Sequence, residues 1–407
     1  MKLIPQFAAV LLLSVCTWAQ TYSYKIALGT SGRNGGSPIS AVTIVGAKGY
    51  GSAGLGNGDL YQAQLSGVRP ETGCCASNAA LAVDSSGDLY GDDANAYHEF
   101  GRVFGVKPGF KWVERDLYDF TGGDDGQIWV GAFFPTGAPI TESPVSLDSS
   151  GDVWGEAYGG GGSACGNVNQ VPECGVIFEL TNNQGIWSET VIHSFSGPPD
   201  GAQPVGGLTF DPMTGAYYGV TTYGGDPVCN CGTVFQLTPN GDGTWSESII
   251  HSFVSAYGGG IQPDGGLVLD ADGNLYGATW EGGDYGFGAV YEISGGQIVQ
   301  LYNFLGGGVN DGANPNGSLV FDSFGNLWGT TYAGGANKLG TVFYLSPSEN
   351  GWQETVLHSF QGWKSRPSDG QQPNTGLSID QAGNLWGTTV QGGDNRDGIF
   401  YEVTVTK

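Results

Sequence analysis

The chain has 407 residues, of which 74 are glycines, 12% are aromatic and only 13% are charged. A disordered chain would be poor in aromatic residues and rich in charge, so this composition favours a folded β-protein with many turns. The formal net charge of −25 argues against nucleic acids and anionic membrane surfaces as partners.

Residues 1–19 have the features of a secretory signal peptide. Lys2 supplies a positive charge, residues 7–15 are largely apolar, and Thr17-x-Ala19 resembles a signal-peptidase site. We therefore predict cleavage near Ala19, a secreted location (periplasmic or extracellular) and one mature domain over 20–407. Losing Lys2 leaves 13 basic against 39 acidic residues, a charge of −26. Lipidation at Cys16 is the alternative, although Val15 stands where a small residue is preferred. No later segment has the roughly 18 consecutive apolar residues of a membrane span.

Six cysteines follow the signal segment, and an even number in an exported chain predicts disulfides. They form three local pairs: Cys74/Cys75, Cys165/Cys174 and Cys229/Cys231. We predict a Cys165–Cys174 bond, because nine residues of spacing close a loop without strain, whereas a bond within either other pair is expected to be strained. Zinc is the alternative, but no CxxC pair or nearby histidine supports it.

A repeated block fills most of the chain. Its core is a short apolar strand, an Asp, a turn and then Gly-(Asn/Asp)-Leu-(Trp/Tyr)-Gly, and successive closing glycines are 52 to 64 residues apart. A Gly-Gly loop follows, then a run such as "GTVFQL" (232–237), a run such as "WSESIIHSF" (245–253) and an Asp-Gly…Pro connector. The six clear cores are 81–91, 145–155, 208–219, 267–277, 319–329 and 377–387.

Each copy therefore holds four strand-like runs separated by Gly and Pro turns. One such unit cannot bury both of its faces alone, but copies arranged radially can pack face to face. We predict an all-β protein with the β-propeller fold, with seven four-stranded blades or, as the alternative, six. A parallel β-helix is the runner-up architecture.

The two ends of the repeat array predict how the ring closes. The last copy ends without its fourth strand, while residues 22–40 match the "WSETVIHSF" strand and the connector after it. We expect residues 22–30 to pair with the last blade, which removes two open sheet edges. Residues 41–78 would then form a degenerate first copy, on which the seventh blade depends, and residues 121–143 an insertion in the second blade.

The repeat resembles the GloVer tandem-repeat proteins. The resemblance rests on Gly-Asn-Leu-Trp-Gly-Thr-Thr (325–331 and 383–389), on the Gly-Gly and Gly-Thr-Val-Phe elements and on His-Ser-Phe. It is strong over 79–407 and weak over 20–78. It implies an exported bacterial protein with no established activity. This chain departs from those members that carry a C-terminal anchor.

Three positions of the repeat carry polar or aromatic side chains in several copies, and we call each such set of equivalent residues a column. The Asp before the turn accepts hydrogen bonds from turn N–H groups; calcium at Asp270/Asp272 is a weaker alternative, because only that copy has a second carboxylate. The aromatic column predicts packing between blades (Tyr90, Trp154, Tyr218, Tyr276, Trp328, Trp386). The histidines share one position that also accepts Tyr and Leu, so we interpret them as packing or surface residues (His193, His251, His358).

The loops after the second strands differ most between copies, and in a four-stranded blade they share one face with the blade-to-blade connectors. Exposed aromatics beside carboxylates bind sugars, so this rim predicts a binding site for a glycan or a protein. The structural alternative is that these rings pack between blades. The predicted ligand-binding residues are Tyr158, Tyr223, Trp280, Glu281, Asp284 and Tyr332.

The leading hypothesis is thus a monomeric, non-enzymatic binding module without cofactor or metal. A lyase or hydrolase with its site at the mouth of the central channel is the second hypothesis. Acids that break the repeat pattern after second strands are its only support (Asp92, Asp93, Glu156, Glu281). A structural component of the envelope or matrix is the third.

Overall fold

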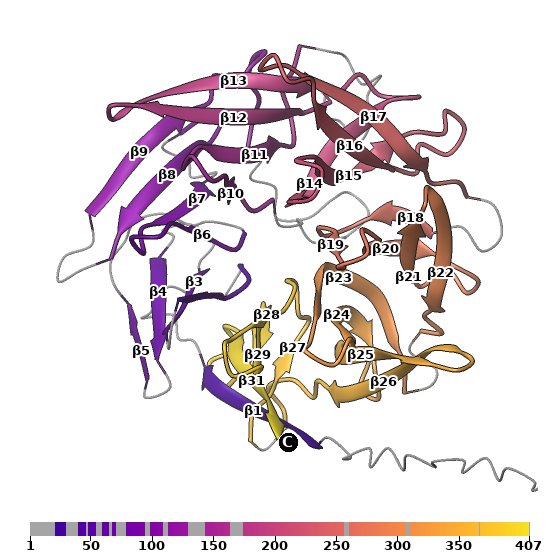
Figure 1. Ribbon diagram of the computed structural model, residues 1–407. Helices are drawn as coiled ribbons and strands as arrows, with labels where there is room; N and C mark the ends of the chain where they lie inside the picture. Colours follow the sequence, from indigo (N-terminus) through magenta and orange to yellow (C-terminus); the bar gives the residue numbers. More distant parts are fainter. Residues whose placement is uncertain are drawn as a thin grey trace, which may run out of the picture.

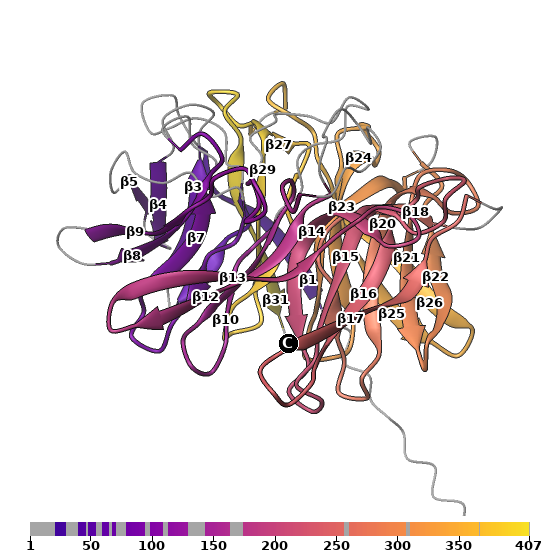
Figure 2. The same ribbon diagram turned by 90° about the horizontal axis from the view of Figure 1, so that it is seen from above.

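The computed structural model describes residues 21–29, 40–45, 48–53, 59–64, 67–70, 79–93, 98–108, 113–128, 143–162, 174–255, 260–306, 310–365 and 367–406. In these residues all regular structure is β-strand. The sheets stand in a ring around a central axis (Figure 1), and their strands cross the thickness of that ring (Figure 2). The predicted β-propeller is confirmed.

The first half of the chain forms four sheets of four strands, each paired in chain order. The first sheet holds β2 (Thr43–Val45), β3 (Lys48–Ala53), β4 (Asp59–Gln64) and β5 (Gly67–Pro70). The second holds β6 (Ala82–Val83), β7 (Leu89–Asp93), β8 (Arg102–Lys107) and β9 (Val113–Asp119). The third holds β10 (Ser146–Leu147), β11 (Val153–Ala157), β12 (Val176–Asn183) and β13 (Ile186–Ser194). The fourth holds β14 (Gly201–Phe210), β15 (Tyr217–Gly224), β16 (Thr233–Pro239) and β17 (Trp245–Ser252).

The second half continues the pattern with antiparallel pairing throughout. A five-stranded sheet holds β18 (Gly260–Pro263), β19 (Val268–Leu269), β20 (Leu275–Gly282), β21 (Ala289–Ser294) and β22 (Gln297–Asn303). A four-stranded sheet holds β23 (Gly312–Phe321), β24 (Leu327–Gly334), β25 (Thr341–Ser348) and β26 (Gly351–Ser359). The last copy holds β28 (Ser378–Ile379), β29 (Leu385–Thr389) and β31 (Ile399–Thr406), with the short pair β27 (Gly370–Gln371) and β30 (Gln391–Gly392) beside them.

The ring closes as the sequence predicts. Strand β1 (Thr21–Gly29) pairs antiparallel with β31, from Thr21 opposite Thr406 to Gly29 opposite Ile399. It supplies the fourth strand of the last sheet, and Figure 1 shows it lying beside β31 although the two are at opposite ends of the chain. This pairing covers the edge that β31 would otherwise present to other chains and makes β1 the outer strand of the sheet.

Each of the six clear repeat copies forms one blade of the ring. The degenerate segment forms the sheet β2–β5 between the last and the first of them, since Val42 packs with Trp386 and Phe400 while Tyr50 packs with Leu81. The second half of the predicted insertion, residues 129–142, lies outside the described residues, as do residues 1–20 of the predicted signal segment.

From the third sheet to the last, neighbouring blades meet at a glycine just before the third strand of the earlier blade. A Cβ atom on Gly232 would lie 2.6 Å from Cδ of Pro263 in the next blade, and Gly340 stands in the same relation to Pro373. The residue before that proline has a positive φ (55° at Gln262), and its N–H donates to the carbonyl of Cys231. This close approach explains why Gly and the Asp-Gly…Pro connector recur together.

The hydrophobic core is divided among the contacts between blades. Trp154 of the third sheet stacks on Tyr217 of the fourth at 4.5 Å between ring centroids, and both are buried. Of the predicted aromatic column, all members but the half-buried Tyr218 are buried (Tyr90, Trp154, Tyr276, Trp328, Trp386). One bulky ring per copy therefore fills the space between faces, as predicted.

One of the three local cysteine pairs is bonded within the described residues. Cys229 and Cys231 are joined by a disulfide. Asn230 between them has a φ of 54°, and this bend places the two Cα atoms 5.2 Å apart, within the range normal for disulfides. Cys174 is buried and disulfide-bonded. Cys165, Cys74 and Cys75 lie outside the described residues, so the Cys165–Cys174 pairing stays a prediction.

The described part of the chain contains no helix with the length and hydrophobicity required to cross a lipid bilayer. The Cys229–Cys231 bond fits an oxidising compartment.

Candidate functional site

Most aromatic residues predicted for the rim are covered by neighbouring blades. Tyr223 and Trp280 are only 6% and 8% exposed. Trp280 contacts the half-buried Tyr332 of the next blade, with ring centroids 5.5 Å apart. The hydroxyl of Tyr158, which follows β11 of the third sheet, donates to Oε1 of Gln203 in the fourth, and burial raises the pKa of Tyr158. These rings pack between blades, which was the structural alternative.

Residues that follow Trp280 in the loop between β20 and β21 are more exposed to solvent. Asp284 is exposed and exchanges hydrogen bonds with Asn303, while Glu281 at the end of β20 is half-buried. The same loop carries Tyr285, which is 57% exposed, and Phe287, which is 40% exposed.

The connector after β22 adds a third exposed apolar side chain to this region. Leu305 is 43% exposed, and Phe287 lies against the next residue of the connector, Gly306. We call Tyr285, Phe287 and Leu305 the rim patch. The signal for it was in the sequence, because "DYGF" (284–287) departs from the polar loops of the other copies.

The acids that suggested an enzyme are mostly buried. Asp92, Asp93 and Glu156 are 4%, 1% and 1% exposed. Asp93 pairs with Arg102, while Oε2 of Glu156 accepts the N–H of Gly207 in the next blade. Asp93 therefore makes a contact inside its blade, and Glu156 makes one between blades.

The carboxylates of the Asp column accept hydrogen bonds from groups of their own turns. Oδ1 of Asp270 accepts the N–H groups of Asp272 and Asn274, and Oδ2 accepts the side chains of Asn274 and Tyr276. Burial acts to raise the pKa of Asp270, but these donors outweigh it and lower the pKa. The same pair of N–H groups donates to Asp84, Asp148, Asp322 and Asp380. At Asp211 the N–H of Met213 and the hydroxyl of Thr214 donate instead, so the turn interpretation is supported.

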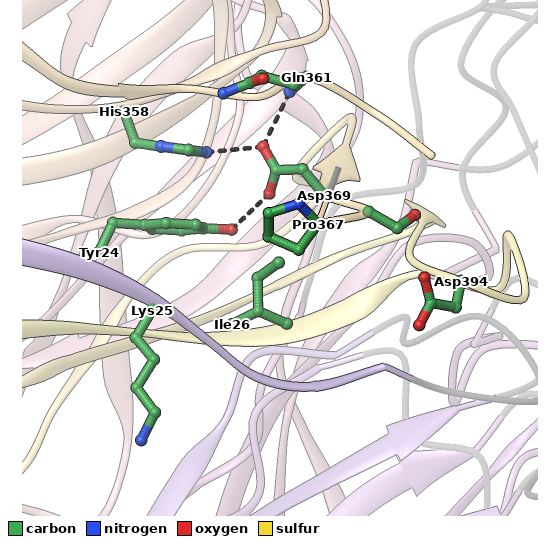
Figure 3. Close-up of a pocket in the computed structure, with 9 residues that line it drawn as sticks. Tyr24, Lys25, Ile26, His358, Gln361, Pro367, Asp369 and Asp394 are labelled. Carbon is green, nitrogen blue, oxygen red and sulfur yellow. Dashed lines mark hydrogen bonds and ion pairs between the residues drawn. The ribbon is translucent and has the colours of Figure 1, made fainter. Parts of the chain in front are cut away.

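A pocket of about 560 Å³ lies where β1 meets β26 and the loop before β31. Figure 3 shows the rings of Tyr24 and His358 side by side, both reaching Asp369, while Asp394 stands apart. The rings are stacked at 3.6 Å; Oδ1 of Asp369 accepts the Tyr24 hydroxyl at 2.9 Å, and Oδ2 lies 2.8 Å from Nε2 of His358.

Backbone N–H groups of Gln361 and Gly370 also donate to Asp369. Burial tends to raise the pKa of this carboxyl, but the hydrogen bonds and the charge of His358 lower it. Both oxygens are therefore engaged, and Asp369 acts as a structural acceptor rather than a free base.

The Tyr24–His358–Asp369 arrangement belongs to a repeated set. We call these clusters outer seams: a His or Tyr on one outer strand, an Asp in the connector after it and a residue from the next outer strand. The others are Tyr118/Asp125/Glu189, His193/Asp200/Glu247 and Tyr302/Asp311/Glu354. The His column was predicted as packing or surface; the Asp partners were missed because the connectors differ in length.

Two outer seams hold a glutamate that titrates near neutrality. Burial, followed by the negative charge of Asp311, raises the pKa of Glu354 to about 8. Burial and Asp125 raise the pKa of Glu189 to about 7. Oε1 of each is buried without a hydrogen-bond partner among the described residues.

We expect Glu354 to make the fold less stable as pH rises. Its ordinary pKa is 4.5, so between pH 4.5 and about 8 the folded chain binds more protons than the unfolded chain. The stabilisation that protonated Glu354 gives the folded chain is fully present below pH 4.5 and is lost as pH rises to about 8. Glu354→Gln should therefore melt above the wild type at pH 8.5 and close to it at pH 4.5. Melting curves across this range test it, with the exposed Glu349→Gln as control; parallel wild-type and Glu354→Gln profiles would contradict it.

The ring, its Gly–Pro blade contacts and its outer seams define a β-propeller built from tandem repeats. The chain belongs to the Gloeobacter/Verrucomicrobia repeat family, whose model matches residues 133–294 and 214–407. This confirms the family resemblance. No curated protein sequence matches the chain.

Solved structures share the fold at low identity. An ancestral GH74 enzyme superimposes with a TM-score of 0.56 at 12% identity, over 92% of this chain and 48% of its own. Puromycin hydrolase gives 0.53 at 13% identity, over 86% and 50%. The WD40 β-propeller domain of Doa1 gives 0.50 at 9%, over 93% and 96%. The chain spans about half of the two enzymes, and at these identities the likeness is one of fold alone.

Proposed function

We propose that the protein is an exported binding module whose partner is a protein segment held at the rim patch. The observation that carries this proposal is the exposure of Tyr285, Phe287 and Leu305 on adjoining loops of one blade. Aromatic anchors on a rigid scaffold account for most of the energy of many protein interfaces. The net charge of −25 favours a segment with basic residues beside its apolar anchors.

A glycan is the second candidate partner. Tyr285 is an exposed ring beside the Asp284 carboxylate and near the Asn303 amide, which are the groups that stack on and hydrogen-bond a sugar. The first candidate is favoured because Tyr223 and Trp280, the rings expected to widen a sugar platform, are covered.

We expect Tyr285→Ser with Phe287→Ser to abolish partner binding without unfolding the ring. Loss of two aromatic anchors should weaken binding by roughly a thousandfold, since each anchor contributes about 2 kcal/mol and about 1.4 kcal/mol is a tenfold change in affinity. The measurement is the affinity for peptides selected from a random library on the wild-type chain, together with a glycan panel.

The matched control is Met213→Ser with Phe324→Ser. Both residues are exposed and lie in turns between first and second strands, on the opposite face of the ring. Selected peptides that bind the rim variant as well as the wild type would refute the rim patch. Glycan binding lost only in the rim variant would replace the protein partner with a sugar.

A further inference from the structure

We propose that the outer seam formed by His193, Asp200 and Glu247 is a binding site for one divalent transition-metal cation of the zinc type, which joins two blades. His193 lies on β13, Asp200 in the connector before β14, and Glu247 on β17 of the next blade. Each offers one ligand atom, and the three atoms all lie within 4.8 Å of one another.

The spacing fits a small cation. Nε2 of His193 and Oδ2 of Asp200 are 3.4 Å apart, which is long for a hydrogen bond. Two ligand atoms of a tetrahedral zinc site stand roughly 3.4 Å apart, given zinc–ligand distances of about 2.1 Å. In the corresponding seam at His358 and Asp369 the separation is 2.8 Å, and a hydrogen bond closes the pair.

Unpartnered ligand atoms are the second observation. Nε2 of His193 and Oε1 of Glu247 are both buried, and neither has a hydrogen-bond partner among the described residues. Buried polar atoms without partners are unfavourable, and a cation between them would satisfy both. Asp200 is held in place by hydrogen bonds from Ser196 and from the N–H of Gly201, which would fix the direction of its carboxylate toward the cation.

The other described seams lack this donor set. Tyrosine replaces histidine at Tyr118 and Tyr302, and the tyrosine hydroxyl bonds the aspartate directly. Tyr24 replaces the glutamate beside His358. One imidazole and two carboxylates suit zinc, and partial exposure of His193 and Asp200 leaves room for water as a fourth ligand. Calcium prefers six or more oxygens and should bind poorly.

The experiment compares zinc content and melting temperature after stripping with a chelator and dialysis against zinc. The wild type should retain one more zinc per chain than His193→Tyr or Glu247→Gln. Zinc should also raise its melting temperature by several degrees, and calcium should not. His193→Tyr copies the residue found in two other seams, so it should fold.

His251→Tyr is the matched control, because it removes a histidine at the same repeat position on β17. It should keep the full zinc content. Equal zinc in the wild type and in His193→Tyr, or a melting temperature unmoved by zinc, would overturn the site. A loss of zinc in His251→Tyr as large as in His193→Tyr would assign the metal to scattered surface histidines and would also overturn it.

Discussion

Removing residues 20–30 should leave the chain unable to fold into a stable ring. Strand β1 covers β31 along its length and places Tyr22 against Trp328 at 4.9 Å and Tyr24 against Tyr401 at 5.5 Å between ring centroids. The side chains lost from this contact are worth on the order of 2–4 kcal/mol each. That sum approaches the total stability of a typical domain, about 5–15 kcal/mol.

The measurement is thermal unfolding together with the soluble fraction after expression. A chain that starts at residue 20 is the control, because it keeps β1. A synthetic peptide of residues 20–30 added to the shortened chain should restore part of the lost melting temperature, since it can pair with the open edge of β31. A shortened chain that melts within a few degrees of the control would show that closure by β1 is dispensable.

Replacing Arg102 by Thr should cost about 3–5 kcal/mol, because it leaves the buried carboxylate of Asp93 without its cation. Nη2 of Arg102 lies 3.1 Å from Oδ2 of Asp93, and these side chains are 8% and 1% exposed. Arg102 also contacts the more exposed Glu114 and Asp116, which can turn to water. Chemical denaturation at pH 7 measures the loss.

The repeat itself supplies the control for this prediction. Asp93 and Arg102 lie opposite each other on the second and third strands of their blade. Thr221 and Thr233 hold the same two positions two blades further on, and their hydroxyl oxygens lie 2.7 Å apart. Asp93→Thr combined with Arg102→Thr should therefore recover most of the stability lost by Arg102→Thr alone. A double variant no more stable than the single one would mean that the loss comes from packing of the arginine rather than from the broken ion pair with Asp93.

The candidate site was predicted only in part from the sequence. The variable loops after the second strands are visible in the sequence, and Asp284 in one of them is exposed. Trp280 and Tyr223 were expected among the binding residues, but their exposure depends on how the next blade lies over them. A repeat pattern shows that a position varies without showing which neighbour covers it.

The sequence by itself determined the family, the propeller architecture and the closure by residues 22–30. Those features follow from local patterns, because alternation, turn glycines and an incomplete last copy are all visible along the chain. Only the tertiary structure decided which side chains meet between blades. The outer seams, the Asp93–Arg102 pair and the grouping of His193, Asp200 and Glu247 each join residues whose distance depends on packing. A sequence records spacing along the chain, whereas burial and charge pairing arise when separate blades come into contact.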